Sequence, residues 1–138
     1  MDIHEQIISA FNLDKRDPNS IPALTLAYLG DCIYELAIRT LMVERGISHV
    51  SDLNKAVVGL VKATAQRDML HAIEDGLTEA ETAVYKRGRN VKSSSCPKGA
   101  TVADYHTATG FEALMGYLYV TGQTQRLLEL VESGLKEI

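Results

Sequence analysis

Two acidic residues that stand inside apolar stretches are the residues of this chain most able to do chemistry. Asp31 lies in the stretch Leu26–Leu36, and Glu112 lies in the stretch Gly110–Leu118. Ionised carboxylates are rarely buried unless they pair with a cation or bind a metal. Both acids stand close to glycines, which allow another backbone to approach closely: Gly30, Gly110 and Gly116. We therefore predict that two helices cross closely here and that their carboxylates form a cation site.

A pair of carboxylates suits Mg²⁺, which is usually held by one or two carboxylates together with waters and substrate phosphate. We expect Asp31 and Glu112 to hold this ion, with Mn²⁺ able to substitute. Such an ion can activate a water for in-line attack on a phosphodiester. Glu35 lies one helical turn after Asp31 on the same face, so it is either a further metal ligand or a solvated surface acid. No Cys/His spacing fits zinc.

The charge of the chain is concentrated in one segment. The net charge is −4, yet the segment Thr82–Ala103 contains no acid. The rest of the chain contains the other nine Lys and Arg residues and all 18 acids. A basic segment on an acidic body is typical of a local contact with nucleic-acid phosphates, and a solvated basic loop is the alternative. The candidate RNA-binding residues are Lys86, Arg87, Arg89, Lys92 and Lys98.

The elements that must position these residues are predicted to be helices only, because strand-like alternation is absent. Ser20 is the expected N-cap of the helix that carries Asp31, and Gly46 is expected to end it. Thr78 and Glu81 have the spacing of a capping box. Cys32 is expected to be a small core residue. The predicted helices cover about 2–11, 21–45, 51–75, 78–88, 104–120 and 123–136, with loops at 12–20 and 90–102.

Length and composition predict one compact domain over residues 1–138. A chain of this length has the size of one domain, and its 46% of apolar residues can form a core. No apolar run approaches the ~20 residues of a membrane span, and the acidic N-terminus lacks a secretory signal, so we expect a cytoplasmic protein without a membrane partner.

Four motifs in order resemble the catalytic domain of ribonuclease III. They are Leu26-Ala27-Tyr28-Leu29-Gly30-Asp31, Tyr34-Glu35, Arg87-Gly88-Arg89-Asn90 and Phe111-Glu112-Ala113-Leu114-Met115-Gly116. The second and third motifs are similar to Mini-ribonuclease III, the short bacterial branch that lacks a double-stranded-RNA-binding domain. The resemblance covers about Leu24 to Tyr119, which is most of the chain.

This resemblance implies an all-α, ribonuclease III endonuclease-domain-like helical bundle that forms a homodimer with its signature helices at the interface. It also implies that Asp31 and Glu112 are catalytic. Ordinary ribonuclease III has further acids at the positions of Leu24, Ala27 and Thr109. The Mini-ribonuclease III branch shares this sparser set of acids, so their loss does not indicate an inactive enzyme.

The expected function is that of a Mg²⁺-dependent endoribonuclease that cleaves double-stranded RNA. A duplex presents shape and phosphates rather than base edges, and a two-fold dimer supplies one active site for each strand. The resemblance implies the 23S ribosomal RNA precursor stem as substrate. Whether a ribosomal protein presents this stem as a further partner is left open by the sequence. Two alternatives remain: a non-catalytic helical RNA-binding or ribosome-assembly module, and a metal-dependent nucleotide phosphohydrolase. The sequence lacks the adjacent His-Asp pair of the best-known helical class of such phosphohydrolases, which argues against the second alternative.

Overall fold

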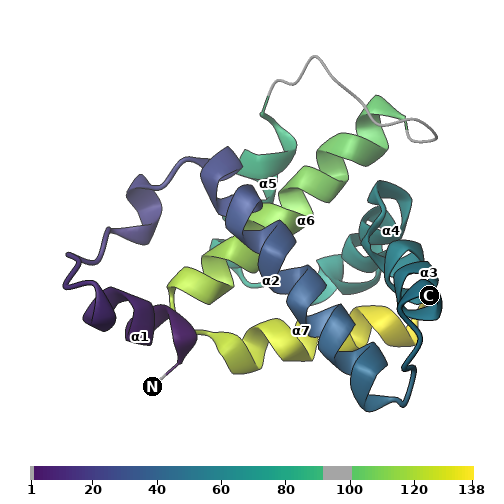
Figure 1. Ribbon diagram of the computed structural model, residues 1–138. Helices are drawn as coiled ribbons and strands as arrows, with labels where there is room; N and C mark the ends of the chain where they lie inside the picture. Colours follow the sequence, from purple (N-terminus) through teal and green to yellow (C-terminus); the bar gives the residue numbers. More distant parts are fainter. Residues whose placement is uncertain (1, 92–100) are drawn as a thin grey trace.

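The computed structural model describes residues 2–91 and 101–138, and these residues form helices and no strands. This confirms the predicted all-α class (Figure 1). None of the described helices combines the length and apolarity needed to cross a bilayer. In chain order the elements are α1 (Ile3–Ala10), the 3₁₀ turn η1 (Pro18–Ser20), α2 (Ala23–Glu44), α3 (Val50–Val61), α4 (Ala63–Ile73), η2 (Glu74–Gly76), α5 (Glu79–Arg89), α6 (Val102–Val120) and α7 (Thr124–Lys136).

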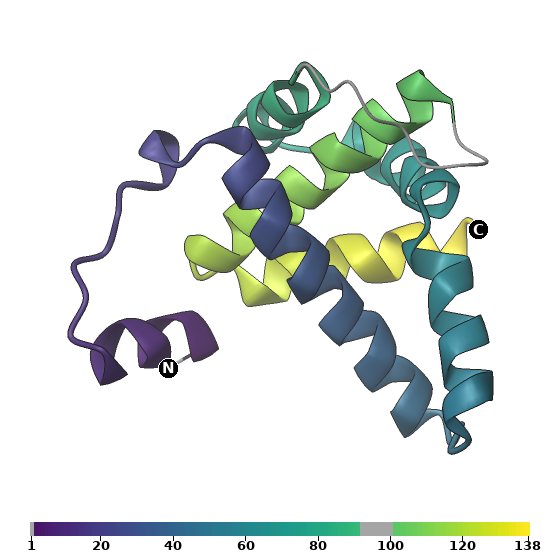
Figure 2. The same cartoon turned by 45° about the horizontal axis from the view of Figure 1, so that its top comes forward.

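Helix α6 is the centre of the bundle. Ten of its 19 residues are buried, including Phe111, Leu114 and Leu118. A helix that is apolar all round must be covered on several sides. Helices α2, α4, α5 and α7 all pack against α6, and α2 makes the most extensive contact. Figures 1 and 2 show α2 crossing α6, with α1 set apart from that crossing. The position of α6 therefore fixes the helices that carry the candidate site.

The backbones of α2 and α6 touch at two glycines. A Cβ atom on Gly30 of α2 would overlap the carbonyl oxygen of Glu112, and a Cβ atom on Gly116 of α6 would overlap the carbonyl oxygen of Leu26. Helices with larger residues at the contact stay about 8–10 Å apart. The predicted close crossing of the two acid-bearing helices is therefore present, and it brings Asp31 alongside Glu112.

Two local predictions about helix boundaries differ from the structure. Ser20 does not cap α2; it lies in η1, where its hydroxyl donates to the Asp17 carbonyl oxygen at 2.7 Å, and α2 begins after Pro22. The helix predicted over 51–75 is broken at Lys62, whose extended ψ of 158° separates α3 from α4. The apolar spacing continues across Lys62, so periodicity alone conceals this break.

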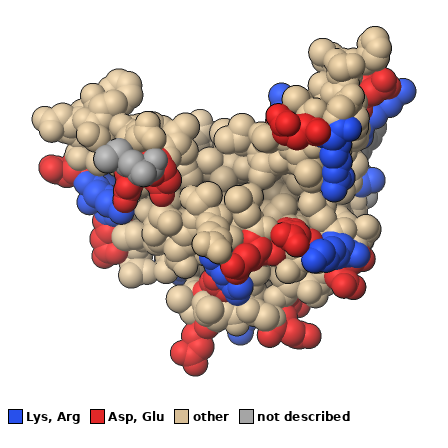
Figure 3. Space-filling model, turned by 90° about the horizontal axis from the view of Figure 1, so that it is seen from below, with Lys and Arg blue, Asp and Glu red and all other residues tan. Residues whose placement is uncertain are grey.

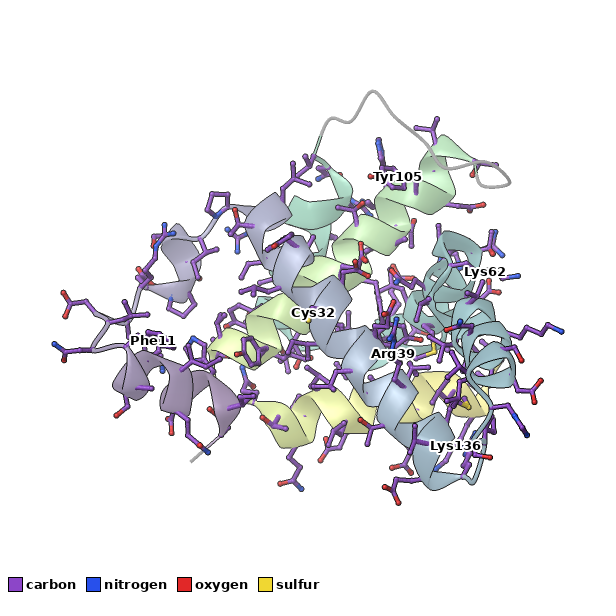
Figure 4. All side chains as sticks on the ribbon, viewed as in Figure 1. Phe11, Cys32, Arg39, Lys62, Tyr105 and Lys136 are labelled. Atoms are coloured by element: carbon purple, nitrogen blue, oxygen red, sulfur yellow. The ribbon has the colours of Figure 1, made fainter. Side chains whose placement is uncertain are left out.

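The other local predictions have mixed outcomes. The Thr78–Glu81 capping box is confirmed, with the Thr78 hydroxyl accepting from the Glu81 amide at 3.1 Å and the Glu81 carboxylate accepting from the Thr78 amide at 2.9 Å. The prediction for Cys32 is wrong, because this thiol is exposed on α2. It lies on the surface of α2 that faces away from α6 (Figure 4).

Helix α1 is attached loosely to the rest of the bundle. It has no buried residue, and an extended connection leads from it to η1. His4 makes an edge contact with Tyr119 of α6 at 5.2 Å between ring centroids. Apolar side chains of this segment remain exposed, with exposed fractions of 57% for Ile3 and 72% for Phe11.

We expect Gly30→Ala to destabilise the fold strongly. Its methyl group would overlap backbone atoms that cannot rotate away, so the free energy of unfolding should fall by about 3 kcal/mol, or roughly 10 °C in Tm. Gly59→Ala is the matched control, because no atom lies within 4 Å of its added Cβ. In the control, the higher helix propensity of alanine should raise stability by about 0.5–1 kcal/mol. Thermal denaturation measures both; equal stability of the two variants would contradict the close crossing.

Candidate active site

Asp31 and Glu112 form a carboxyl pair across the α2–α6 crossing. The side chain of Asp31 lies in an exposed part of α2, whereas Glu112 is half-buried on α6. Burial raises the pKa of Glu112 to about 8, and the neighbouring Asp31 carboxylate adds to this shift. Without a cation, Glu112 therefore keeps its proton near neutral pH. The structure thus joins the two acids that the sequence singled out.

This pair fits a divalent cation. Burial and the neighbouring Asp31 carboxylate both disfavour a charged Glu112, and a cation held between the two carboxylates would offset both effects. Among residues 2–91 and 101–138, no group of three or more His, Cys, Asp or Glu side chains could hold a metal. The remaining ligands would have to be waters and substrate oxygens, which is the usual arrangement around Mg²⁺.

Glu35 is engaged with another residue. Its carboxylate pairs with Arg39 at 2.6 Å, one turn further along α2 (Figure 4). The side chain of Arg39 is 63% exposed, and exposed ion pairs of this kind are weak and can reorganise. The structure therefore gives Glu35 a cationic partner without joining it to the carboxyl pair in a cluster of three. Its role as a metal ligand stays a prediction.

The three positions where ordinary ribonuclease III has further acids carry uncharged side chains in this protein. Leu24 is exposed and Ala27 is buried on α2. Thr109 is buried on α6, and its hydroxyl donates to the Tyr105 carbonyl oxygen at 3.0 Å within the same helix. None of these three side chains adds a charged oxygen to the pair.

Two buried polar side chains beside the site were missed by the sequence reasoning. Gln66 of α4 is 2% exposed, and its amide donates to the Val61 carbonyl oxygen at 3.0 Å. Tyr34 of α2 is fully buried, and its ring makes an edge contact with Phe111 at 5.1 Å between centroids. The available signal was a glutamine at a core position of a helical pattern, three residues before Met69. Such a position is normally apolar.

The described part of the basic segment forms the last turn of α5. Lys86 and Arg87 are exposed, whereas Arg89 lies over the Tyr85 ring at 5.4 Å. A Cβ on Gly88 would lie 2.9 Å from the Cα of Gly110, so this turn rests on α6 two residues before Glu112. Lys92 and Lys98 lie outside the described residues. The basic turn and the carboxyl pair are thus held by the same segment of α6.

Comparison with known proteins agrees with this fold. The family profile "Ribonuclease III domain" matches residues 24–123. A protein named Mini-ribonuclease 3 from Symbiobacterium thermophilum is 48% identical over 118 residues, which are 86% of this chain and 91% of that protein. Mini-ribonuclease 3 from Enterococcus faecalis is 44% identical over 125 residues, covering 89% and 95% of the two chains.

A solved structure shares the architecture. The crystal structure of a protein from Fusobacterium nucleatum is similar with a TM-score of 0.77 and 32% identity, and the match covers 85% of this chain and 93% of that one. The matching family model and the similarity to these relatives define a ribonuclease III-type endoribonuclease. The chain belongs to the ribonuclease III family, in its Mini-ribonuclease III branch.

We expect the carboxyl pair to make the metal-free protein less stable as the pH rises. Glu112 keeps its proton in the folded state up to about pH 8, whereas its ordinary pKa is 4.5. Between these values the unfolded chain binds fewer protons than the folded chain, so the free energy of unfolding falls as pH increases. After allowance for solvent screening of a half-buried group, the loss at pH 8 should be about 1–2 kcal/mol.

Glu112→Gln removes this titration and tests the effect directly. Its Tm without divalent ions should exceed that of the wild type at pH 8 by several degrees, and the difference should shrink towards pH 5. Denaturation across this pH range measures both proteins. If the stability of the wild type rises relative to the variant between pH 5 and 8, the raised pKa of Glu112 is contradicted.

Proposed function

We propose that this protein is a Mg²⁺-dependent endoribonuclease that cleaves both strands of double-stranded RNA, with residues 1–138 acting as one catalytic domain. The observation that carries the proposal is the pair Asp31–Glu112 at the glycine crossing of α2 and α6. Resemblance to the Mini-ribonuclease III branch favours the stem of the 23S ribosomal RNA precursor as the substrate, in the cytoplasm, with a ribosomal protein as a further partner that could present it.

The residues of this chain have separate roles in the reaction. Asp31 and Glu112 would hold Mg²⁺, which supplies Lewis-acid stabilisation of charge on the phosphodiester and lowers the pKa of the attacking water. Glu112 must first lose its proton, because the protonated carboxyl cannot bind the cation. The buried residues of α6 keep the Glu112 backbone fixed, and Gly30 keeps Asp31 within reach of it. No nucleophilic side chain is needed, because water attacks the phosphorus.

The basic turn of α5 provides the contact with the RNA backbone. Lys86 and Arg87 are exposed and carry no sequence-reading chemistry, so they suit the phosphates of an A-form duplex. Their helix is anchored to α6 through Gly88. A phosphate row held by this turn would therefore lie at a fixed offset from the carboxyl pair.

A homodimer would supply the second active site. The surface of α2 opposite α6 exposes large apolar side chains, with exposed fractions of 79% for Tyr28 and 54% for Leu36. Beside it, an open groove of about 740 Å³ runs between α2 and α7, with Ile3 at one end. Figure 3 shows the molecule hollowed between two projections, with mostly uncharged residues in the middle. Exposed apolar surface on this scale is typical of a protein interface. We infer that a second copy covers it.

Asp31→Asn and Glu112→Gln should each reduce cleavage of duplex RNA in Mg²⁺ by at least about 10³-fold, because each removes a charged oxygen from the cation site while preserving the side-chain shape. Single-turnover cleavage of a labelled duplex measures this. Asp52→Asn, an exposed acid in the first turn of α3, is the control and should cleave normally. A normal rate for either site variant would refute the proposed site, and binding without cleavage by the wild type would favour an RNA-binding module.

The same variant also tests the dimer. In mixtures of wild type and Asp31→Asn, heterodimers contain one functional site for two strands. As the fraction of the variant rises, duplexes cut in one strand should accumulate at the expense of doubly cut product. A monomeric enzyme would give slower cleavage with an unchanged ratio of products.

Replacing Lys86 and Arg87 together with alanine should weaken duplex binding and reduce the slope of log affinity against log salt by about two, because each lost phosphate contact removes nearly one released counterion. Binding is measured over a range of salt concentrations with Ca²⁺ in place of Mg²⁺. The control replaces Lys15 and Arg16, an exposed pair between α1 and η1. If both double variants lower the slope equally, the basic turn has no special contact with RNA.

A further inference from the structure

Helix α2 carries an ion pair close to Asp31. Glu35 follows Asp31 by four residues and Arg39 follows Glu35 by four, so the three side chains lie along one side of the helix. The Arg39 guanidinium contacts the Glu35 carboxylate at 2.6 Å. Arg39 is the only Lys or Arg within α2, and Figure 4 marks it beyond Cys32, towards the C-terminal end of the helix. A single positive charge therefore lies about two turns from Asp31.

Helices α5 and α3 contact α2 on opposite sides of Asp31 along the helix. Val84 of α5 packs in one cluster with Ala27, four residues before Asp31. After Asp31, the Tyr34 hydroxyl donates to the Leu60 carbonyl oxygen of α3 at 2.8 Å. The helix with the basic turn therefore lies beside the part of α2 that precedes the carboxyl pair, and the ion pair lies in the part that follows it.

The Arg39 guanidinium can bind more than Glu35. Its side chain is 63% exposed, and it makes no other ion pair within residues 2–91 and 101–138. The contact with Glu35 uses one of its nitrogens, Nη2, whereas arginine has five N–H donors and binds phosphate through two parallel hydrogen bonds. Neither side chain lines the groove between α2 and α7. A polyanion near Asp31 and Glu35 meets two negative charges, and Arg39 is the base of α2 that can offset them.

We propose that Arg39 is a second contact for the RNA backbone, and that Glu35 pairs with its guanidinium until a phosphate replaces the carboxylate. This inference rests on the binding of duplex RNA in the proposed function. A strand that passes the carboxyl pair from the basic turn of α5 would reach Arg39 on the other side of Asp31. An exposed ion pair within one helix stabilises that helix only slightly, so the exchange of partners costs little.

The test measures the affinity for a labelled RNA duplex in EDTA, so that a metal-binding role of Glu35 cannot contribute. Glu35→Gln should strengthen binding, because it frees the guanidinium and removes a negative charge beside the RNA. Adding Arg39→Gln to this variant should weaken binding about eightfold at 0.1 M salt, and lower the slope of log affinity against log salt by nearly one, because one phosphate contact is lost. In the wild type, Arg39→Gln should weaken binding less, because there the phosphate must first replace Glu35.

Glu132 and Lys136 of α7 form the matched control pair. They are exposed, have the same order and spacing in the sequence, and make a contact at 3.1 Å. Glu132→Gln and Lys136→Gln change the net charge by the same amounts, but should alter the affinity for RNA by less than about twofold because salt screens distant charges. If wild-type binding needs Ca²⁺, Arg39→Gln and Lys136→Gln are compared in Ca²⁺, with the same expected difference.

Two results would overturn the role of Arg39 and leave the carboxyl pair untouched. One is an affinity that Arg39→Gln does not change, and the other is an equal change from the two pairs of variants. A wild type that binds no duplex RNA, with or without Ca²⁺, would instead overturn the proposed function together with this inference.

Discussion

The contact between the backbones of α2 and α6 at Gly30 and Gly116 sets the position of the groups that the site uses. Asp31 follows directly on Gly30, and the carbonyl oxygen that Gly30 touches belongs to Glu112. The separation of the two backbone positions that carry the carboxyl groups is therefore determined by main-chain atoms. A helix pair held by leucines could shift as its rotamers change, whereas a backbone contact leaves almost no freedom to slide or rotate.

The same contact forces an electrostatic conflict. Burial and proximity raise the pKa of Glu112 to about 8, so the folded chain holds a proton where the proposed function requires a cation. Shifted pKa values of this kind are common at functional sites, where the protein is less stable than it would be without the charged groups that bind its ligand. The apolar core around Phe111, Leu114 and Leu118 tolerates this local cost, because these side chains of α6 are fully buried among the surrounding helices.

The sequence predicted the features that depend on local chemistry. An acid beside a glycine in an apolar stretch was sufficient to select Asp31 and Glu112 and to predict a close crossing of their helices. The capping residues Thr78 and Glu81 were equally clear. The break at Lys62 was missed because apolar spacing continues through it. Gln66 was missed because its burial and its hydrogen bond to the Val61 carbonyl oxygen arise only from that break and from tertiary packing. Ser20 and Cys32 failed for a related reason: their environments depend on tertiary contacts, which neither propensity nor periodicity describes.

Helix α1 differs from the rest of the bundle because none of its residues is buried. Its hydrogen bonds can consequently open with little loss of apolar burial. The free energy of that local opening should lie far below the free energy of global unfolding. The N-terminal segment should therefore open and close locally while the crossing of α2 and α6 stays intact.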